Sequence, residues 1–187
     1  FGGLHKKFKV EPDMAMFGKA LGNGFAITAV LGKAEIMKHV QDSFVSSTFW
    51  TERIGYVAAL KTLEYMEKVN SWEVISNNGR KIKESWLSLA KKNNLSISVS
   101  GIDALPIFTF ENYHLESKTF VTQEMLKRGI LATNTVYTSI LHTSDSLKEY
   151  YIALDKIFAI LGACEHGLAI ASLLDGPVSH AGFSRLN

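Results

Sequence analysis

Two long helical patterns that follow one another almost directly constrain the fold of this chain most strongly. In residues 52–69 apolar side chains recur every three or four positions, which is the spacing of one helix face. A second stripe of this kind runs through residues 72–92 and ends before the Asn93-Asn94 pair. A third pattern, in residues 147–164, predicts another long helix with a continuous apolar face.

The segments between the second and the last helix predict a small α+β domain. Residues 95–99 alternate between apolar and polar side chains, and residues 105–110 follow as a partner strand after a glycine turn. A helix is expected over residues 117–127 and a short strand over residues 130–133. The order helix, strands, helix, strand, helix therefore suits a small α+β domain over residues 71–187.

The first seventy residues do not complete a fold by themselves. Residues 1–25 are glycine-rich and irregular, and the apolar run 26–31, bounded by glycines, predicts a buried strand. A short helix is expected over residues 33–41. We interpret residues 1–70 as the edge of a larger α/β sheet and residues 71–187 as a separate domain, so the predicted fold class is α/β and α+β.

Composition and charge exclude several classes of protein. The 187 residues are 47% hydrophobic and 20% charged, which excludes a disordered or collagen-like chain. The net charge of +2 gives no reason to expect a nucleic-acid partner. No apolar run approaches the length of a membrane span. The single cysteine, Cys164, favours a reducing compartment, so we expect a cytoplasmic protein without a membrane partner.

Some residues carry reactive groups without forming a recognisable site. The six histidines show no pair at zinc-ligand spacing on one helix, so no metal site is predicted. Cys164 lies on the apolar stripe of the last helix and is expected to be a core residue. Arg185 could contact a substrate carboxylate or make a structural ion pair, and the sequence leaves both open.

The strongest chemical signal lies in residues 12–32. Lys19 stands between an apolar run and a glycine-rich turn, where glycines allow the backbone to approach a ligand closely. A lysine on such a semi-buried turn loses its charge more easily, which an amine nucleophile requires. From these residues alone, a surface lysine in a loop between a strand and a helix is the simpler alternative.

The residues around Lys19 also resemble the active-site signature of the class III aminotransferases. The pattern Pro-Asp-x4-Gly-Lys-x2-Gly-x-Gly occupies residues 12–24. This family comprises pyridoxal-phosphate enzymes of fold type I and includes glutamate-1-semialdehyde aminomutase. The resemblance covers essentially the whole chain, with further matches in family order at residues 32–37, 46–49, 58–63 and 182–186.

The resemblance implies roles for three residues. Lys19 would form the Schiff base with pyridoxal phosphate and, once released, would move a proton between substrate and cofactor. Thr48, with its neighbour Ser47, would bind the cofactor phosphate across a dimer interface. The helix expected to begin near Thr51 would add N–H donors to that anion site. The implied activity is transfer of an amino group between an amine or amino acid and an oxo compound, by a homodimer.

The chain also departs from the family pattern. Asn23 stands where the family has glycine, a mild change because asparagine tolerates left-handed backbone angles. Residues 133–139 lack the glutamate of the aminomutase, which favours an aminotransferase. In the family the phosphate loop, the ring-stacking aromatic and the aspartate that pairs with the pyridine nitrogen precede the lysine, and this sequence contains none of them. We therefore interpret it as a C-terminal portion that is inactive alone.

Two alternatives remain open. One is the aminomutase, which moves an amino group within a single substrate. The other is a non-catalytic fragment that binds no cofactor and exposes apolar surface where a larger sheet should pack. Because segment 26–31 lacks its sheet neighbours and segment 52–69 part of its cover, we expect the chain to dimerise or aggregate, or its N-terminal part to pack abnormally.

Overall fold

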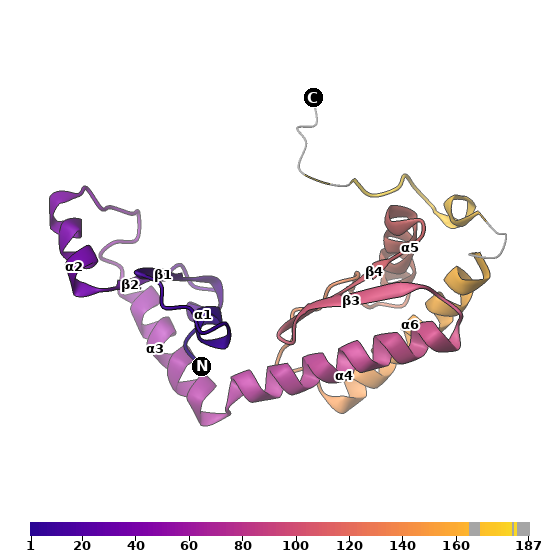
Figure 1. The fold of residues 1–187 in the computed structure, drawn as a ribbon, viewed down its shortest axis with the longest axis horizontal. Helices are drawn as coiled ribbons and strands as arrows, with labels where there is room; N and C mark the ends of the chain where they lie inside the picture. Colours follow the sequence, from indigo (N-terminus) through magenta and orange to yellow (C-terminus); the bar gives the residue numbers. More distant parts are fainter. Residues whose placement is uncertain (165–168, 181, 183–187) are drawn as a thin grey trace. The chain divides into compact units, whose positions relative to one another are not determined.

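A computed structural model describes residues 1–164, 169–180 and 182 (Figure 1). These residues form two compact units, Phe1–Trp72 and Glu73–Asn187, and each is described by itself. Arg185 and most of the closing segment that resembles the family lie outside the described residues. Within the described ranges, no helix is both long and apolar enough to cross a membrane.

The first unit combines several short elements with one long helix. The long helix, α3, confirms the prediction for residues 52–69, whereas a single turn of α-helix followed by a 3-10 helix replaces the one helix expected over residues 33–41. In chain order the elements are α1 (Leu4–Lys7), β1 (Met14–Phe17), the 3-10 helix η1 (Lys19–Leu21), β2 (Ala29–Gly32), α2 (Ala34–Met37), the 3-10 helix η2 (Lys38–Asp42) and α3 (Arg53–Lys68).

The prediction of a buried strand over residues 26–31 was wrong in its position and in its burial. The strand β2 begins at Ala29 and pairs antiparallel with β1, so that Phe17 lies opposite Ala29. Its side chains are not covered, because Val30 is 43% and Leu31 60% exposed. A buried strand needs cover on both faces. Among the described residues, β2 has β1 as its one neighbouring strand.

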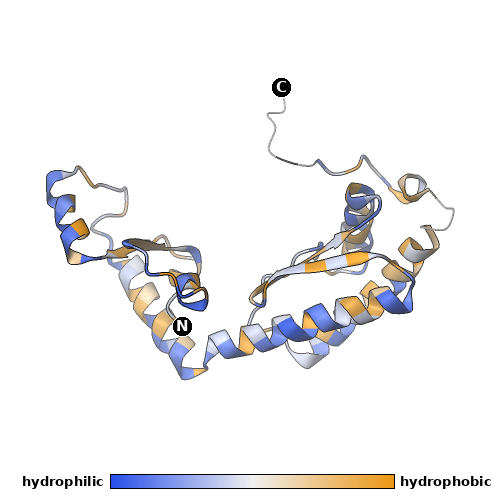
Figure 2. Cartoon of the chain, viewed as in Figure 1, coloured by the Kyte–Doolittle hydropathy of each residue, from blue (hydrophilic) through white to orange (hydrophobic). Residues whose placement is uncertain are grey.

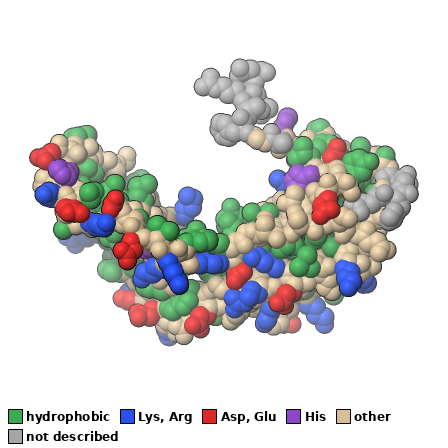
Figure 3. All heavy atoms as spheres, in the orientation of Figure 1, with side chains coloured by type: hydrophobic (Ala, Val, Ile, Leu, Met, Phe, Trp, Pro, Cys, Tyr) green, Lys and Arg blue, Asp and Glu red, His purple; other side chains and the backbone are tan. Residues whose placement is uncertain are grey.

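Apolar side chains reach the surface over much of this unit (Figure 3). Of its described hydrophobic residues, Ala59 alone is fully buried. On α3 the side chains of Ile54, Val57 and Leu60 are each more than half exposed. The helix therefore has the incomplete cover that the sequence predicts.

The second unit is a helix, a β-hairpin and two further helices, which confirms the α+β prediction. The hairpin is antiparallel and runs from the pair Ile97–Phe110 to the pair Ile102–Leu105. The elements are α4 (Ser71–Lys92), which begins within the first unit, β3 (Ile97–Ile102), β4 (Leu105–Phe110), α5 (His114–Lys127), α6 (Ser144–Cys164) and the 3-10 helix η3 (Ile170–Leu173).

Aromatic side chains from three elements form the centre of the core in this unit. The ring of Phe108 on β4 meets Trp86 on α4 edge to face at 4.7 Å and Phe158 on α6 at 5.7 Å. Trp86 Nε1 donates a hydrogen bond to Tyr150 Oη at 2.9 Å. Along the ribbon of α4, polar and apolar residues alternate with the turns (Figure 2). Cys164 is 5% exposed in this core, as the sequence predicts.

The strand expected over residues 130–133 was misplaced by a few residues. The next segment, 134–138, extends the hairpin instead: Phe108 N–H donates to Asn134 O, and Val136 N–H donates to Pro106 O. The prediction followed the apolar character of residues 130–133. Those residues instead carry the chain from the end of α5 to the edge of β4, where backbone pairing begins.

Ion pairs and a close backbone contact fix the tip of the hairpin to α4. The Asp103 carboxylate accepts hydrogen bonds from Lys83 at 3.0 Å and from Arg80 at 3.1 Å. A Cβ atom added at Gly79 would lie 1.6 Å from Asp103 O. Glycine at this position of α4 is therefore required for the approach.

Candidate functional site

Lys19 lies on a turn between β1 and β2 whose backbone is unusual for a lysine. Gly18 is extended, and Lys19 begins η1 with a left-handed φ of 47°. Such a conformation costs a non-glycine residue about 1 kcal/mol. The Lys19 carbonyl accepts hydrogen bonds from the N–H groups of Gly22 and Asn23, both at 3.2 Å. Local hydrogen bonds thus hold a strained lysine, and strain of this kind is a reason to look for function.

The departure from the family at Asn23 fits the same turn. Gly22 has a right-handed φ of −84°, whereas Asn23 has a φ of 48° and Gly24 a φ of 104°, so the backbone is left-handed again at the end of the turn. Asparagine adopts these angles more easily than most residues. The turn then closes through a hydrogen bond from Phe25 N–H to Gly22 O at 3.1 Å.

The turn is semi-buried, as expected, because Gly22 is buried and Gly18 and Leu21 are half-buried, but the side chain of Lys19 itself is exposed. Only Gly22 in this turn is buried, because the turn rests on α3 through one side and presents its other side outward. Within the part of the chain that the structure describes, Lys19 Nζ has no hydrogen-bond or ion-pair partner. No described side chain or backbone group therefore holds this amine in place.

Ser47 and Thr48 lie in the loop between η2 and α3, and both are exposed. The N–H of Trp50 donates to Ser47 O at 3.2 Å, which forms a turn just before the helix. The helix α3 begins at Arg53, two residues later than expected, and its N-cap residue Glu52 makes no side-chain capping bond. The first N–H groups of α3 are thus left available to an anion.

Lys19, Ser47 and Thr48 belong to the same unit, but no described hydrogen bond links the lysine to the two hydroxyl residues. The turn that carries Lys19 contacts α3, and the loop with Ser47 and Thr48 leads into the same helix. The role that the resemblance implies for Thr48 toward the site of a partner subunit stays a prediction.

The chemistry of these groups fits a cofactor with a carbonyl and a phosphate. A free primary amine suits the carbonyl, while two exposed hydroxyls and uncapped helix N–H groups suit the phosphate. The carboxylate of Glu52 is the adverse group, because it stands at the helix terminus that an anion would approach. In the described ranges, no cluster of His, Cys, Asp and Glu could hold a metal ion.

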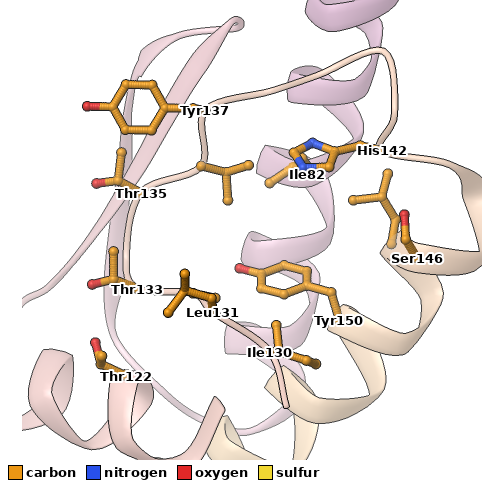
Figure 4. A pocket seen from close by; sticks show the side chains of 13 residues that line it. Ile82, Thr122, Ile130, Leu131, Thr133, Thr135, Tyr137, His142, Ser146 and Tyr150 are labelled. Atoms are coloured by element: carbon orange, nitrogen blue, oxygen red, sulfur yellow. The ribbon is translucent and has the colours of Figure 1, made fainter. Parts of the chain in front are cut away.

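A cavity of about 620 Å³ lies in the second unit, and none of the predicted site residues lines it (Figure 4). Its wall includes Ile82 of α4, Thr122 of α5 and Tyr150 of α6, with Leu131 and Tyr137 from the segment between α5 and α6. It contains no carboxylate, lysine, arginine or cysteine. The sequence offered no signal for it, because its residues come from four separate segments without a shared motif.

The titratable groups most affected by burial also belong to the second unit. Burial raises the pKa of the Cys164 thiol, and it raises the pKa of the Tyr150 phenol above its usual range. A thiol with a raised pKa inside an apolar core is a poor nucleophile. Cys164 is therefore a packing residue, and Lys19 remains the nucleophile candidate.

Comparison with known proteins decides the family. The class III aminotransferase family matches residues 3–157, which is most of the chain. The chain belongs to the class III aminotransferase family. The matched range includes Lys19, Ser47 and Thr48, and it confirms the resemblance seen in the sequence.

Curated relatives of this aminotransferase-family chain include two enzymes of different activity. A 3-aminobutyryl-CoA aminotransferase from Cloacimonas acidaminovorans is 38% identical over 111 residues, covering 59% of this chain and 27% of the relative. A glutamate-1-semialdehyde 2,1-aminomutase from Hyperthermus butylicus is 27% identical over 175 residues, covering 84% of this chain and 41% of the relative. The family is thus one of enzymes.

Solved structures confirm the fold. The pyridoxal-phosphate-bound FumI protein of a Sphingopyxis species, described as its internal aldimine form, matches with a TM-score of 0.79 at 22% identity, over 90% of this chain and 42% of that one. An omega-transaminase from Sphaerobacter thermophilus matches with a TM-score of 0.75 at 18% identity, over 84% and 40%. The chain thus spans about two fifths of these structures, and pyridoxal phosphate is indicated as the family's cofactor.

Proposed function

We propose that this chain supplies the cofactor lysine of a pyridoxal-phosphate-dependent aminotransferase. The whole enzyme transfers an amino group between an amine or amino acid and an oxo compound. The observation that carries the proposal is Lys19 itself, an unpaired amine on a strained, hydrogen-bonded turn inside the family's lysine motif. When bound, pyridoxal phosphate supplies an electron sink that stabilises negative charge on the substrate carbon.

Lys19 takes the reactive role in this proposal, and Ser47, Thr48 and α3 bind the cofactor phosphate. Lys19 holds the cofactor covalently through Nζ and, when freed, carries the proton to or from the substrate carbon. Thr48 and Ser47 donate hydroxyl hydrogen bonds to the phosphate, and the first N–H groups of α3 add their dipole to it. In this reading residues 1–70 belong to the cofactor-binding large domain, and residues 71–187 form the small C-terminal domain.

The same proposal places the complete active site beyond these 187 residues. The family's phosphate loop, ring-stacking aromatic and pyridine-pairing aspartate have no counterpart here, so the chain alone is expected to bind cofactor weakly and to turn over no substrate. A homodimer brings Thr48 of one subunit to the cofactor of the other. The single cysteine continues to favour the cytoplasm as its location.

The aminomutase is the second candidate, because one relative with that activity aligns with most of the chain. It predicts amino transfer within one substrate and no requirement for a separate acceptor. The lack of a glutamate in residues 133–139 argues against it. A full-length enzyme that needs both an amino donor and an oxo acceptor excludes this candidate.

Cofactor labelling tests the proposal directly. The chain is mixed with pyridoxal phosphate, borohydride makes each carbonyl–amine linkage permanent, and the modified peptides are mapped by mass spectrometry. We expect label on Lys19 in preference to the other lysines, and loss of this preferential label in Lys19→Ala. Lys9 is the matched control, since it is also exposed and left-handed, with a φ of 54°. Equal label on Lys9 and Lys19 would show that the chain does not recognise the cofactor.

A further inference from the structure

The first unit buries very few residues, and two of them are glycines beside the lysine turn. Among its described residues only Gly22, Gly55, Ala59 and Ser71 are buried. Gly22 belongs to the turn that carries Lys19, and Gly55 lies in the first helical turn of α3. Burial in this unit is thus concentrated where the lysine turn meets the helix.

Gly55 allows the helix to touch the backbone of the neighbouring segment. A Cβ atom added at Gly55 would lie 2.7 Å from Ala26 O and 3.1 Å from Ile27 Cβ. The first of these atoms is a backbone carbonyl, which cannot rotate away as the end of a flexible side chain does. Any side chain at this position must therefore push α3 and the Ala26–Ile27 segment apart.

Gly22 makes the same kind of contact from within the turn. Its added Cβ atom would lie 2.1 Å from Phe25 O and 2.9 Å from Ile27 Cγ2. Gly22 is also one of the two residues whose N–H groups bind the Lys19 carbonyl. Ile27 is thus enclosed between a glycine of the lysine turn and a glycine of the helix.

We propose that Gly22 and Gly55 form a joint without side chains, through which α3 sets the backbone position of Lys19. Both glycines are then positioning residues, because each acts on Lys19 through the Phe25–Ile27 segment. The proposal rests on the function proposed for Lys19 above. It adds that the direction of the lysine amine depends on contact with a helix more than thirty positions away along the chain.

Helix propensity and the proposed contact predict different effects of Gly55→Ala. Alanine is a better helix former than glycine, so Gly55→Ala favours α3 if helix formation is all that matters. The joint predicts the opposite effect at Lys19, because the new methyl group displaces the segment that holds the turn. Retained helix content combined with a loss at Lys19 is an outcome that general unfolding of the unit does not produce.

The experiment compares Gly55→Ala with the unaltered chain and with Gly176→Ala, which places its methyl group in open space. The readouts are the rate of borohydride-trapped labelling by pyridoxal phosphate at Lys19 relative to Lys9, the absorption spectrum of the adduct, and the circular dichroism spectrum. We expect labelling of Lys19 to slow by about tenfold in Gly55→Ala, as a displaced reacting group implies. Labelling of Lys9 should not change, and Gly176→Ala should match the parent.

A second variant covers the case in which Gly55→Ala fails to fold. Ile27→Ala removes the side chain enclosed by the two glycines and introduces no clash, so it loosens the joint without forcing the segments apart. It should also lower the preference for Lys19. Parental labelling of Lys19 in a folded Gly55→Ala chain, or in Ile27→Ala, overturns the joint. Absence of preferential labelling in the unaltered chain overturns the proposed function instead, so the two failures are distinguishable.

Discussion

The two units of this chain differ in how they use their apolar residues. Residues 73–187 enclose a core in which Trp86, Phe108 and Phe158 are fully buried and meet edge to face. In residues 1–72 the aliphatic side chains of α3 are exposed, and burial falls on small residues instead. The lysine motif lies in residues 1–72, where few side chains are buried. We therefore propose that residues 73–187 supply most of the stability and residues 1–72 the chemistry.

Truncation of the aromatic core should have the largest effect. Trp86→Ala leaves a large cavity and removes the hydrogen-bond partner of Tyr150 Oη. We expect it to lower the free energy of unfolding of the second unit by about 4 kcal/mol. Denaturant titration followed by circular dichroism measures the loss. Leu131→Ala, at a side chain 93% exposed, is the control and should change little.

The attachment of the hairpin to α4 should come next. Gly79→Ala places a methyl group against the backbone carbonyl of Asp103. We expect a loss of about 2 kcal/mol, because overpacking forces the helix and the hairpin apart. The same denaturant titration measures it. Gly129→Ala would have open space for its methyl group, but its φ of 74° adds strain, so Gly176→Ala is the cleaner control. Equal stability of the two variants would contradict the close approach.

The ion pair of Arg128 and Glu124 should make a smaller, pH-dependent contribution to the stability of the second unit. The Arg128 guanidinium beside Glu124, aided by Lys127, holds the pKa of that carboxyl well below its usual range, at about 2. A lowered folded-state pKa contributes stability that is present above the unfolded value of about 4.5 and is lost as the pH falls toward 2. Glu124→Gln should therefore cost the second unit about 1 kcal/mol at pH 7 and markedly less near pH 2.

Denaturant midpoints of both proteins at a series of pH values measure this effect. An equal cost of Glu124→Gln at pH 7 and near pH 2 would show that the Arg128–Glu124 pair contributes no charge-dependent stability.

Substitution on the exposed face of α3 should have the smallest effect on folding. Val57→Ser and Leu60→Ser remove apolar side chains that are 57% and 61% exposed. We expect each to change the free energy of unfolding by less than about 0.5 kcal/mol, apart from a small helix-propensity cost. The double variant should reduce self-association, which sedimentation velocity detects as a shift toward smaller species. Unchanged association would mean that another surface drives it.

The sequence predicted the long helices and β4 closely and the short elements poorly. Helices such as α3 repeat their apolar spacing over several turns, so the pattern averages over local exceptions. The strand β1 was missed because Met14–Phe17 is almost uniformly apolar and lies in a glycine- and proline-rich region. Its pairing with β2 is a tertiary contact that no local pattern records.

For the candidate site, the motif located Lys19 but gave no reason for its geometry. The left-handed angle at Asn23 was anticipated from the residue type, whereas the same angle at Lys19 was not. No sequence pattern indicated the contact between Gly55 and Ala26. It joins segments far apart in the sequence, and it is possible because Gly55 has no side chain. Family resemblance alone pointed to Thr48 and Ser47.

Amide hydrogen exchange with and without pyridoxal phosphate tests the central claim most directly. If the loosely covered unit holds the cofactor through Lys19, protection should increase at the N–H groups of Gly22 and Asn23 and in the first turn of α3. The core strand β4 should show no change, and Lys19→Ala should abolish the effect. Protection gained instead around the cavity beside Tyr137 and Tyr150, or nowhere in residues 1–72, would contradict this assignment of the chemistry.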